Sequence, residues 1–386
     1  MPNARRWNPL NTLFLLGTLG LALVLVPLHL VLNGFRWSEW LLSLGMVFAI
    51  GTAISAGYHR LFSHRAFQAS APVRFLLLVF GAASFENSAL KWSSDHRVHH
   101  KHVDTPRDPY AIQNGFWFAH WGWVMNGKDL PLAGVEDLQK DPLVRWQHRH
   151  HFLIGAFVAL IPAYVGLATG HLWGHLVIGV LLRIVLTHHT TFLINSAAHV
   201  LGTRPYTDTN TARDSALLAP FTYGEGYHNF HHMWQWDYRN GVKWYQWDST
   251  KWLLNLLRWV GLVKGLRRVS TPVIRRAELA MEAKRLRARL EQAAAEGASV
   301  VVQRLDEAHA RMDLALKGLH DQQVAWEQTR REWKVRLAQR RAELGQAWEV
   351  RRAEWRETLA RQRAEVRVAA RAWRETRRVV QRLVYA

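Results

Sequence analysis

The sequence contains no cysteine. This absence excludes disulfide bonds, thiolate metal sites, iron–sulfur clusters and cysteine nucleophiles. Any bound metal ion must therefore be held by histidine, aspartate or glutamate. The sequence also lacks a Cys-x-x-Cys-His haem motif and a glycine-rich dinucleotide fingerprint after a predicted strand. If the protein performs redox chemistry, its electrons must come from another protein.

Proline is absent after Pro272, and the composition changes near the same point. Most long apolar runs lie before about residue 265, whereas the rest of the chain is rich in Arg, Glu, Ala, Gln and Leu. We therefore expect a membrane-embedded domain over residues 1–270 and a charged helical extension over 271–386. About half of the formal net charge of +20 falls in this extension, so the charge does not mark a single site.

Four apolar stretches are about long enough to cross a bilayer as helices. They cover residues 10–32, 40–57, 152–170 and 172–194. Short connections predict two transmembrane hairpins, and the first stretch is too long for the core of a signal peptide. The intervening segments 58–151 and 195–272 are rich in Lys and Arg, which by the positive-inside rule places them and both termini in the cytoplasm.

A fifth apolar run, Val73 to Leu90, is interrupted by Glu86, Asn87 and Ser88. We expect it to lie in the interface or against the bundle rather than to span, because a fifth span would invert the next segment. Arg183 falls inside the fourth span and requires a partner within the bundle. The sequence does not identify that partner. The fold class is thus an all-α integral membrane protein with four transmembrane helices and a helical cap.

The extension repeats apolar residues at heptad spacing, at Leu359, Val366, Trp373 and Val380. This pattern predicts one or two long amphipathic helices, with breaks at Gly297, Gly318 and Gly345. Heptad spacing is typical of helices that form a coiled coil. Self-association or docking to a partner is the favoured role. Nucleic acid is not expected as a partner, because Arg and Glu are interleaved as on a solvated helix surface.

Histidines carry the strongest signal, because many of the 21 gather in clusters. On a helix, positions i, i+3 and i+4 share one face, so a His-x-x-His-His cluster is expected to converge on one point. Nine imidazoles at one membrane face suit two metal ions, although ligand type alone does not distinguish zinc, copper, iron and nickel. The clustered residues are His59, His64, His96, His99, His100, His199, His228, His231 and His232.

A single histidine near a membrane end is usually an interfacial side chain. Two clusters with the same spacing make that explanation remote for the set. The His-Glu-x-x-His motif of zinc proteases is absent, and so are the Glu-x-x-His pairs of ferritin-like diiron proteins.

The chain resembles the membrane-bound fatty acid desaturase superfamily, specifically its stearoyl-CoA desaturase branch with bacterial members. The resemblance covers residues 35–270 and rests on His59 to His64, Trp92-Ser-Ser-Asp-His96-Arg-Val-His99-His100-Lys101, Asn195-Ser-Ala-Ala-His199 and Gly224-Glu-Gly-Tyr-His228-Asn-Phe-His231-His232. It implies two iron ions (Fe²⁺) held by the nine histidines, with Asn195 reaching one iron through water. The oxidant implied is O₂.

The resemblance also implies the substrate and the residues around it. We expect a cis double bond, Δ9 in position, to be introduced into a saturated acyl-CoA. Trp92 and Thr191 match positions where the acyl chain bends, and Glu86 stands where the family normally has an amide. Arg97 and Lys101 are candidates for binding the phosphates of CoA, with membrane-anchoring roles as the alternative. His102, His188 and His189 match no ligand, so they are expected to be structural or to support ligands.

Alternative activities within the superfamily are those of an acyl-lipid desaturase, a fatty acyl hydroxylase or an alkane monooxygenase. A ferredoxin, or a b-type cytochrome with its reductase, is the expected electron donor. The expected location is a bacterial inner membrane, with the active site facing the cytoplasm and the lipid bilayer surrounding the spans.

Overall fold

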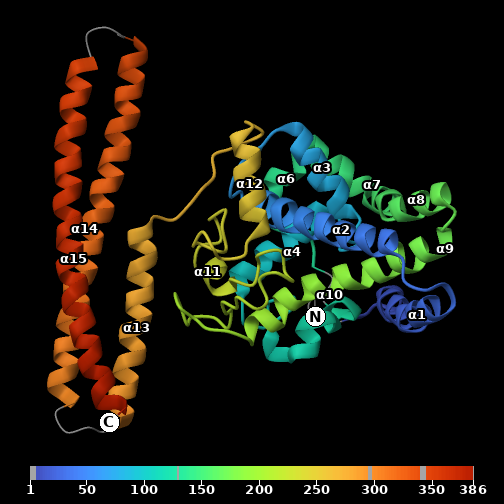
Figure 1. The fold of residues 1–386 in the computed structure, drawn as a ribbon, viewed down its shortest axis with the longest axis horizontal. Helices are drawn as coiled ribbons and strands as arrows, with labels where there is room; N and C mark the ends of the chain where they lie inside the picture. Colours follow the sequence, from blue (N-terminus) through green and yellow to red (C-terminus); the bar gives the residue numbers. More distant parts are fainter. Residues whose placement is uncertain (1–5, 128–129, 294–297, 340–344, 386) are drawn as a thin grey trace. The chain divides into compact units, whose positions relative to one another are not determined.

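The structure is a computed structural model that describes residues 6–127, 130–293, 298–339 and 345–385 (Figure 1). Helices dominate the described residues, and the strands there are two residues long. The chain divides into two compact units. The first contains residues 1–204 and 209–268, and the second contains 205–208 and 269–386.

Four continuous helical stretches of the first unit are long and apolar enough to cross a membrane, which confirms the expected number and order of spans. They are Pro9–Asn33, Trp37–Ser63, Pro142–Thr169 and Leu172–His199. Their component helices are α1 (Pro9–Asn33), α2 (Trp37–Ala53), η1 (Ile54–Ser63), α7 (Pro142–Ala159), α8 (Ile161–Thr169), α9 (Leu172–Gly174), η4 (His175–Leu182), α10 (Arg183–Asn195) and η5 (Ala197–His199).

The spans are longer than their hydropathy indicated, and the second and third differ most. The second runs to Ser63 instead of residue 57, and the third begins at Pro142 instead of residue 152. The added turns of the second span carry polar residues such as His59 and Arg60, which are buried inside the protein. Those of the third span carry Arg145, His148 and Arg149, which are exposed. Hydropathy therefore located the apolar parts of these helices and missed their polar turns.

Local sequence explains where the first helix starts and stops. The Asn8 side chain accepts a hydrogen bond from the backbone N–H of Asn11 at 2.9 Å, and Pro9 occupies the first turn. The helix ends at Gly34, whose positive φ of 74° suits glycine. These signals frame a helix whose apolar side chains mostly face outwards.

The fifth apolar run forms α3 (Ala71–Ala82), which is too short to be a candidate span. Arg183 is fully buried, and its Nη1 donates a hydrogen bond of 2.8 Å to the carbonyl oxygen of Ala83. The partner that the sequence did not reveal is thus a free carbonyl at the end of α3.

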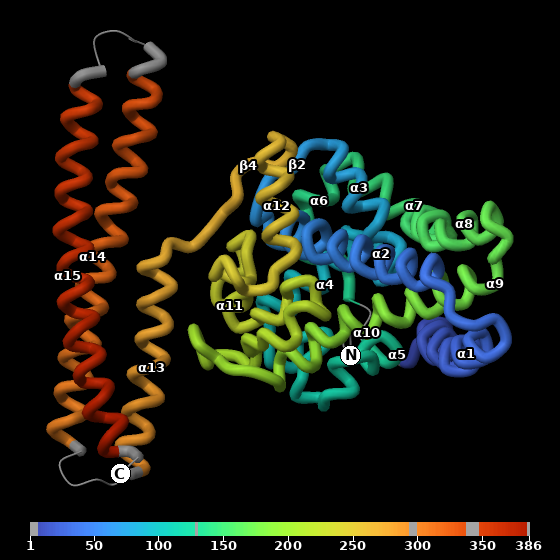
Figure 2. Tube along the Cα trace, viewed as in Figure 1, coloured from blue at the N-terminus to red at the C-terminus, as the bar shows by residue number. Residues whose placement is uncertain are grey.

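Connections between the spans build a cap with its own core around Tyr58, Leu78 and Leu254. Two small strand pairs close the cap: β1 (Arg6–Trp7) with β3 (Asn126–Gly127), and β2 (Gln68–Ala69) with β4 (Val263–Lys264), the latter side by side in Figure 2. The cap helices are α4 (Ala89–His102), η2 (Ile112–Asn114), η3 (Phe118–Gly122), α5 (Trp123–Met125), α6 (Glu136–Gln139), α11 (His228–Met233) and α12 (Ser249–Trp259).

The second unit contains three long helices, α13 (Thr271–Ala293), α14 (Ala298–Gln339) and α15 (Gly345–Tyr385). The expectation of one or two helices was therefore wrong, and so was the break at Gly318, because α14 runs through it. Gly297 lies outside the described residues. Of the heptad residues, Leu359, Trp373 and Val380 are buried.

The helices of the second unit pack around their own apolar core, which includes Leu290, Leu305 and Val380. In the part of α14 and α15 nearest their connection, indole rings fill the interface instead. Trp326 stacks on Trp355 with ring centroids 4.3 Å apart. Formation of a coiled coil between chains stays a prediction.

Candidate metal centre

The helix η1 brings two histidines of the second span onto one side. It is a π-helix, in which backbone hydrogen bonds join residues five apart, and the His64 N–H donates to the His59 carbonyl at 3.1 Å. Five residues therefore make about one turn, and the His59 and His64 rings lie with centroids 4.8 Å apart. A spacing of five residues thus brings both histidines to one side because this turn is wider than that of an α-helix.

Helix α4 presents its three histidines to two different places. Ser88 caps this helix by accepting a hydrogen bond from the Lys91 N–H at 3.2 Å. His96 and His100 are one turn apart, whereas His99 points about 100° away from His100 around the helix. The short helix α11 repeats this arrangement, with His228 and His232 separated from His231.

The nine histidines form two groups of potential ligands, and in each group the ligand atoms lie within 4.8 Å of one another. One group is His59, His64, His96, His100 and His231, and the other is His99, His199, His228 and His232. The expectation that each His-x-x-His-His cluster converges on one point was wrong. Residues i and i+3 lie about 60° apart and i and i+4 about 40° on the opposite side, so the two edges of the cluster face separate centres.

Nitrogen–nitrogen distances within the groups fit coordination of a metal ion. His64 Nε2 lies 2.9 Å from His96 Nε2, and His231 Nε2 lies 2.9 Å from His100 Nε2. In the other group, His228 Nε2 and His232 Nε2 are 3.1 Å apart. Bonds of about 2.1 Å to one ion place neighbouring ligand nitrogens about 3.0 Å apart, which agrees with these distances.

Burial also prepares the histidines for metal binding. Burial first, and then repulsion between neighbouring imidazolium forms, hold the pKa of these rings well below its usual range. The rings are therefore neutral at physiological pH, and their lone pairs are free to bind a cation. This applies outside the spans to His64, His96, His100, His228, His231 and His232.

Outer partners fix the orientation of several rings. His99 Nδ1 lies 2.9 Å from Asp108 Oδ1, and His59 Nδ1 lies 3.0 Å from Glu225 Oε2. A carboxylate accepts only, so it favours the tautomer with the proton on Nδ1 and the Nε2 lone pair directed into the group. His199 Nδ1 contacts Thr211 Oγ1 at 2.8 Å, and His199 Nε2 is buried without a hydrogen-bond partner among the described residues.

Glu225 is itself held by a buried ionic network. Arg60 lies between Glu225 and Asp248, at 2.9 Å and 3.0 Å, and all three side chains are almost completely buried. Burial alone would raise the pKa of Glu225, but His59 and Arg60 outweigh it and hold the pKa well below its usual range. Gly224 allows the close approach, because a Cβ there would lie 2.6 Å from Asp248 Oδ1.

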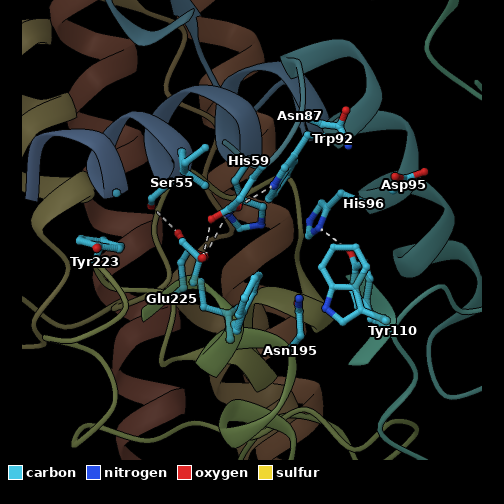
Figure 3. A pocket seen from close by; sticks show the side chains of 17 residues that line it. Ser55, His59, Asn87, Trp92, Asp95, His96, Tyr110, Asn195, Tyr223 and Glu225 are labelled. Carbon is cyan, nitrogen blue, oxygen red and sulfur yellow. Dashed lines mark hydrogen bonds and ion pairs between the residues drawn. The ribbon is translucent and has the colours of Figure 1, made fainter. Parts of the chain in front are cut away.

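A pocket adjoins the first histidine group, as Figure 3 shows, and His59, His96 and Asn195 are part of its wall. Trp92, Thr191 and Glu86 also line it. Thr191 Oγ1 donates to Glu86 Oε1 at 2.5 Å, and Trp92 Nε1 donates to Glu86 Oε2 at 3.3 Å. The three residues predicted to contact substrate therefore form one hydrogen-bonded cluster beside the metal ligands.

Arg97 and Lys101 lie elsewhere in the cap. The Arg97 guanidinium pairs with Asp137 at 2.7 Å and donates to the carbonyl oxygens of Ser63 and Phe62 at 3.0 and 2.6 Å. These contacts tie α4 to the end of η1, and they favour a structural role over binding of a CoA phosphate. Lys101 is exposed.

The remaining histidines singled out in the sequence belong to neither group. His188 Nε2 contacts the carbonyl oxygen of Ser84 at 2.7 Å, and His189 Nδ1 contacts His120 Nε2 at 2.9 Å. His102 ends α4. These contacts are structural, within the described part of the chain.

Sequence reasoning missed the residues that orient the ligands. Glu225 lies inside the Gly224-Glu-Gly-Tyr-His228 motif, and its position between two glycines could have identified it as a residue close to the ligands. Asp108 and Thr211 come from loops without a pattern, and only the folded chain brings them to His99 and His199.

The spans and the two histidine groups define a membrane protein with a polyhistidine metal site. The model of the fatty acid desaturase family matches residues 36–263. The chain belongs to the fatty acid desaturase family.

Curated relatives agree with this assignment. The chain is 41% identical to Acyl-CoA desaturase 1 of Saccharomyces cerevisiae over 266 residues, which is 68% of this chain and 51% of that protein. It is 44% identical to a probable acyl-CoA desaturase of Schizosaccharomyces pombe, over 57% of this chain and 48% of that protein. It is 32% identical to an acyl-CoA Delta(11) desaturase of Spodoptera littoralis, over 65% of this chain and 77% of that protein.

The chain thus spans about half the length of the first two relatives. All three relatives are eukaryotic, so the bacterial type included in the resemblance is not supported by them.

Proposed function

We propose that this protein is an oxygen-dependent fatty acyl-CoA desaturase with a diiron centre. The observation that carries the proposal is the position of the pocket, whose wall contains both metal-ligand histidines and the cluster of Trp92, Thr191 and Glu86. The names of the relatives support acyl-CoA as the substrate class.

In this proposal His59, His64, His96, His100 and His231 hold one iron, and His99, His199, His228 and His232 hold the other. Asn195, at the end of α10 in the pocket wall, would supply a water-mediated contact to one of the irons. Bound iron and O₂ would supply the oxidising power that breaking an unactivated C–H bond requires. Glu225, Asp108 and Thr211 keep the imidazole rings in the tautomer and orientation that bind a cation.

The pocket residues position the acyl chain. Methylene groups offer no hydrogen bond, so only the shape of the wall determines which carbons stop beside the ligands. The Trp92 ring stacks on His96 with centroids 4.7 Å apart, and it therefore fixes the wall relative to a ligand. Glu86 accepts the hydrogen bond of the indole N–H, and Thr191 in turn donates to Glu86.

We propose the Δ9 position, in a saturated acyl chain, from the resemblance to stearoyl-CoA desaturases. The Delta(11) relative shows that neighbouring positions occur in similar proteins, so bond position is the property to measure. Electrons come from a ferredoxin or from a b-type cytochrome with its reductase. The active site and both termini face the cytoplasm, as the Lys- and Arg-rich connections favour.

Expression in a host lacking its own desaturase tests the proposal, with double-bond positions located by mass spectrometry. The expected product is a cis-monounsaturated acid, together with close to two iron ions per chain. His231→Ala should abolish the product, and Trp92→Ala should lower it and spread the bond positions. A hydroxylated product, or zinc in place of iron, would contradict the proposal. If a labelled saturated fatty acid is supplied, a labelled double bond that appears in intact lipids before it appears in acyl-CoA would indicate an acyl-lipid desaturase.

A further inference from the structure

A stripe of arginines runs along one side of α15. Seven exposed arginines follow one another at intervals of three, four or seven residues, which on a helix places them on the same side. They extend over about 39 Å at 1.5 Å per residue. We call this set the arginine stripe: Arg352, Arg356, Arg363, Arg367, Arg371, Arg374 and Arg378.

The stripe is separate from the side of α15 that packs inside the second unit. Trp373 and Val380 face the core of that unit and are buried there. Most of the glutamates of α15 project from another side, because Glu357 and Glu375 are about 100° from the middle of the stripe. The stripe side of this helix is therefore rich in arginine and poor in glutamate, although Arg and Glu are interleaved along the sequence.

Few counter-charges neutralise the stripe. Within the described part of the chain, Arg352 pairs with Glu349 at 3.3 Å, and no ion pair involves the other six. Like charges one helical turn apart destabilise a helix. The stripe therefore does not stabilise the second unit, and a function outside that unit accounts for it better.

We propose that the arginine stripe binds anionic lipid headgroups and holds α15 along the membrane surface. A straight row about 39 Å long presents all its guanidinium groups to a flat surface at once, whereas a curved partner meets only some of them. Guanidinium groups bind phosphate through paired hydrogen bonds.

The membrane is also a partner to which the chain is already attached, if the candidate spans are inserted in it. Four candidate spans precede the second unit in the same chain, so a bilayer is always within reach and weak contacts are sufficient. Anionic lipids attract basic segments that lie within a Debye length of the surface, which is about 10 Å at 0.1 M salt. The proposal does not depend on the activity of the first unit.

The full chain, reconstituted in vesicles, provides the test. Because the sequence has no cysteine, Ala360→Cys creates a unique labelling position, and Ala360 is exposed between Arg356 and Arg363 on the stripe side. A fluorophore there is compared in phosphatidylcholine vesicles and in vesicles that also contain phosphatidylglycerol, each with a quencher on the lipid headgroup. We expect quenching in the anionic vesicles alone, and its loss as salt is raised towards 1 M.

A matched pair of variants isolates the stripe. The first carries Arg356→Gln, Arg363→Gln, Arg367→Gln and Arg374→Gln, and the second removes four exposed arginines of α14 through Arg304→Gln, Arg311→Gln, Arg330→Gln and Arg336→Gln. Each stripe arginine should contribute about fivefold to the equilibrium constant for membrane binding, so this constant should be several hundredfold lower in the first variant. The second should remain quenched.

Equal quenching in neutral and anionic vesicles would overturn the proposal. An equal loss of quenching in the two arginine variants would also overturn it. Absence of quenching in anionic vesicles, together with slower tumbling of the label when an oligonucleotide is added, would identify a nucleic-acid surface instead. The same response to an acidic protein would identify a protein partner.

Discussion

At the scale of single residues, the pairing of Asp108 with His99 gives the clearest test of metal affinity. Asp108→Asn replaces a carboxylate, which only accepts, by an amide that can also donate to His99 Nδ1, so the His99 tautomer is no longer fixed. This change should weaken iron binding about 10–100-fold. Iron retained against a chelator measures this. Glu225→Gln is less suitable, because it also leaves the buried Arg60 with only Asp248 as an ionic partner.

Asp237→Asn provides the matched control for Asp108. Asp237 is equally buried, but it pairs with Arg239 at 2.8 Å rather than with a histidine. The Asp237→Asn variant should therefore retain iron even if the protein becomes less stable. Equal iron loss in both variants would mean that the effect comes from general destabilisation.

We expect Glu86 to make the proposed activity sensitive to pH. Burial raises the pKa of Glu86 from 4.5 to about 7, although hydrogen bonds from Thr191 and Trp92 act in the opposite direction. The phenols of Tyr58 and Tyr223 also face it. Because the pKa of Glu86 is raised on folding, its neutral form favours the folded state. This contribution to the free energy of unfolding is fully present below about pH 4.5 and is lost as the pH rises through about 7.

We therefore expect acyl-chain binding to weaken between about pH 6 and 8, one pH unit on either side of that pKa, because an ionised carboxylate then faces methylene groups. Initial rates of Glu86→Gln should lose this dependence. Asp95→Asn alters another carboxyl of the pocket, one that pairs with Lys91 at 2.7 Å, and should retain it. A pH profile that is identical in the wild-type protein and Glu86→Gln would refute the assignment.

At the scale of helices, close packing of α7 on the end of α3 depends on one glycine. A Cβ at Gly155 would lie 2.4 Å from the carbonyl oxygen of Ala82, whereas a Cβ at Gly45 meets nothing within 4 Å. Gly155→Ala should lower the thermal midpoint by several degrees, about 1–3 kcal/mol of strain. Gly45→Ala should leave it unchanged or raise it slightly.

Thermal unfolding in a fixed detergent compares these two variants. Both changes lie inside helices of candidate spans, so helix propensity affects them equally. A Gly155→Ala variant as stable as Gly45→Ala would show that α7 and α3 can separate at little cost.

The sequence predicted which histidines gather and which helices carry them, because ligand spacing and apolar length leave local patterns. It could not predict how they are divided. The assignment of His99 to one group and His100 to the other depends on the rotation of α4, which Arg97 and its carbonyl partners help to fix. The widened turn of η1 was equally hidden, since π-helices have no distinct residue preference that the sequence reveals.

At the scale of the whole molecule, the metal ligands and the pocket all belong to the first unit. Truncation after Arg268 should therefore retain iron and desaturation, with at most a moderate loss of activity. Each unit has its own apolar core, so we expect the first unit to fold without the second. Iron content and product formation, measured on the purified truncation, check this. A well-folded, iron-loaded truncation without activity would show that the second unit contributes to catalysis.

The helices α4 and α11 each serve both histidine groups, and this has a consequence for how the protein is assembled. Rotating either helix to suit one ion displaces a ligand of the other, so the two positions are energetically linked. Filling one fixes the helices that the other needs, and emptying one releases them. In the proposed diiron centre, metal loading would then be cooperative. A preparation with half its iron would be a mixture of complete and empty molecules, with few half-filled intermediates.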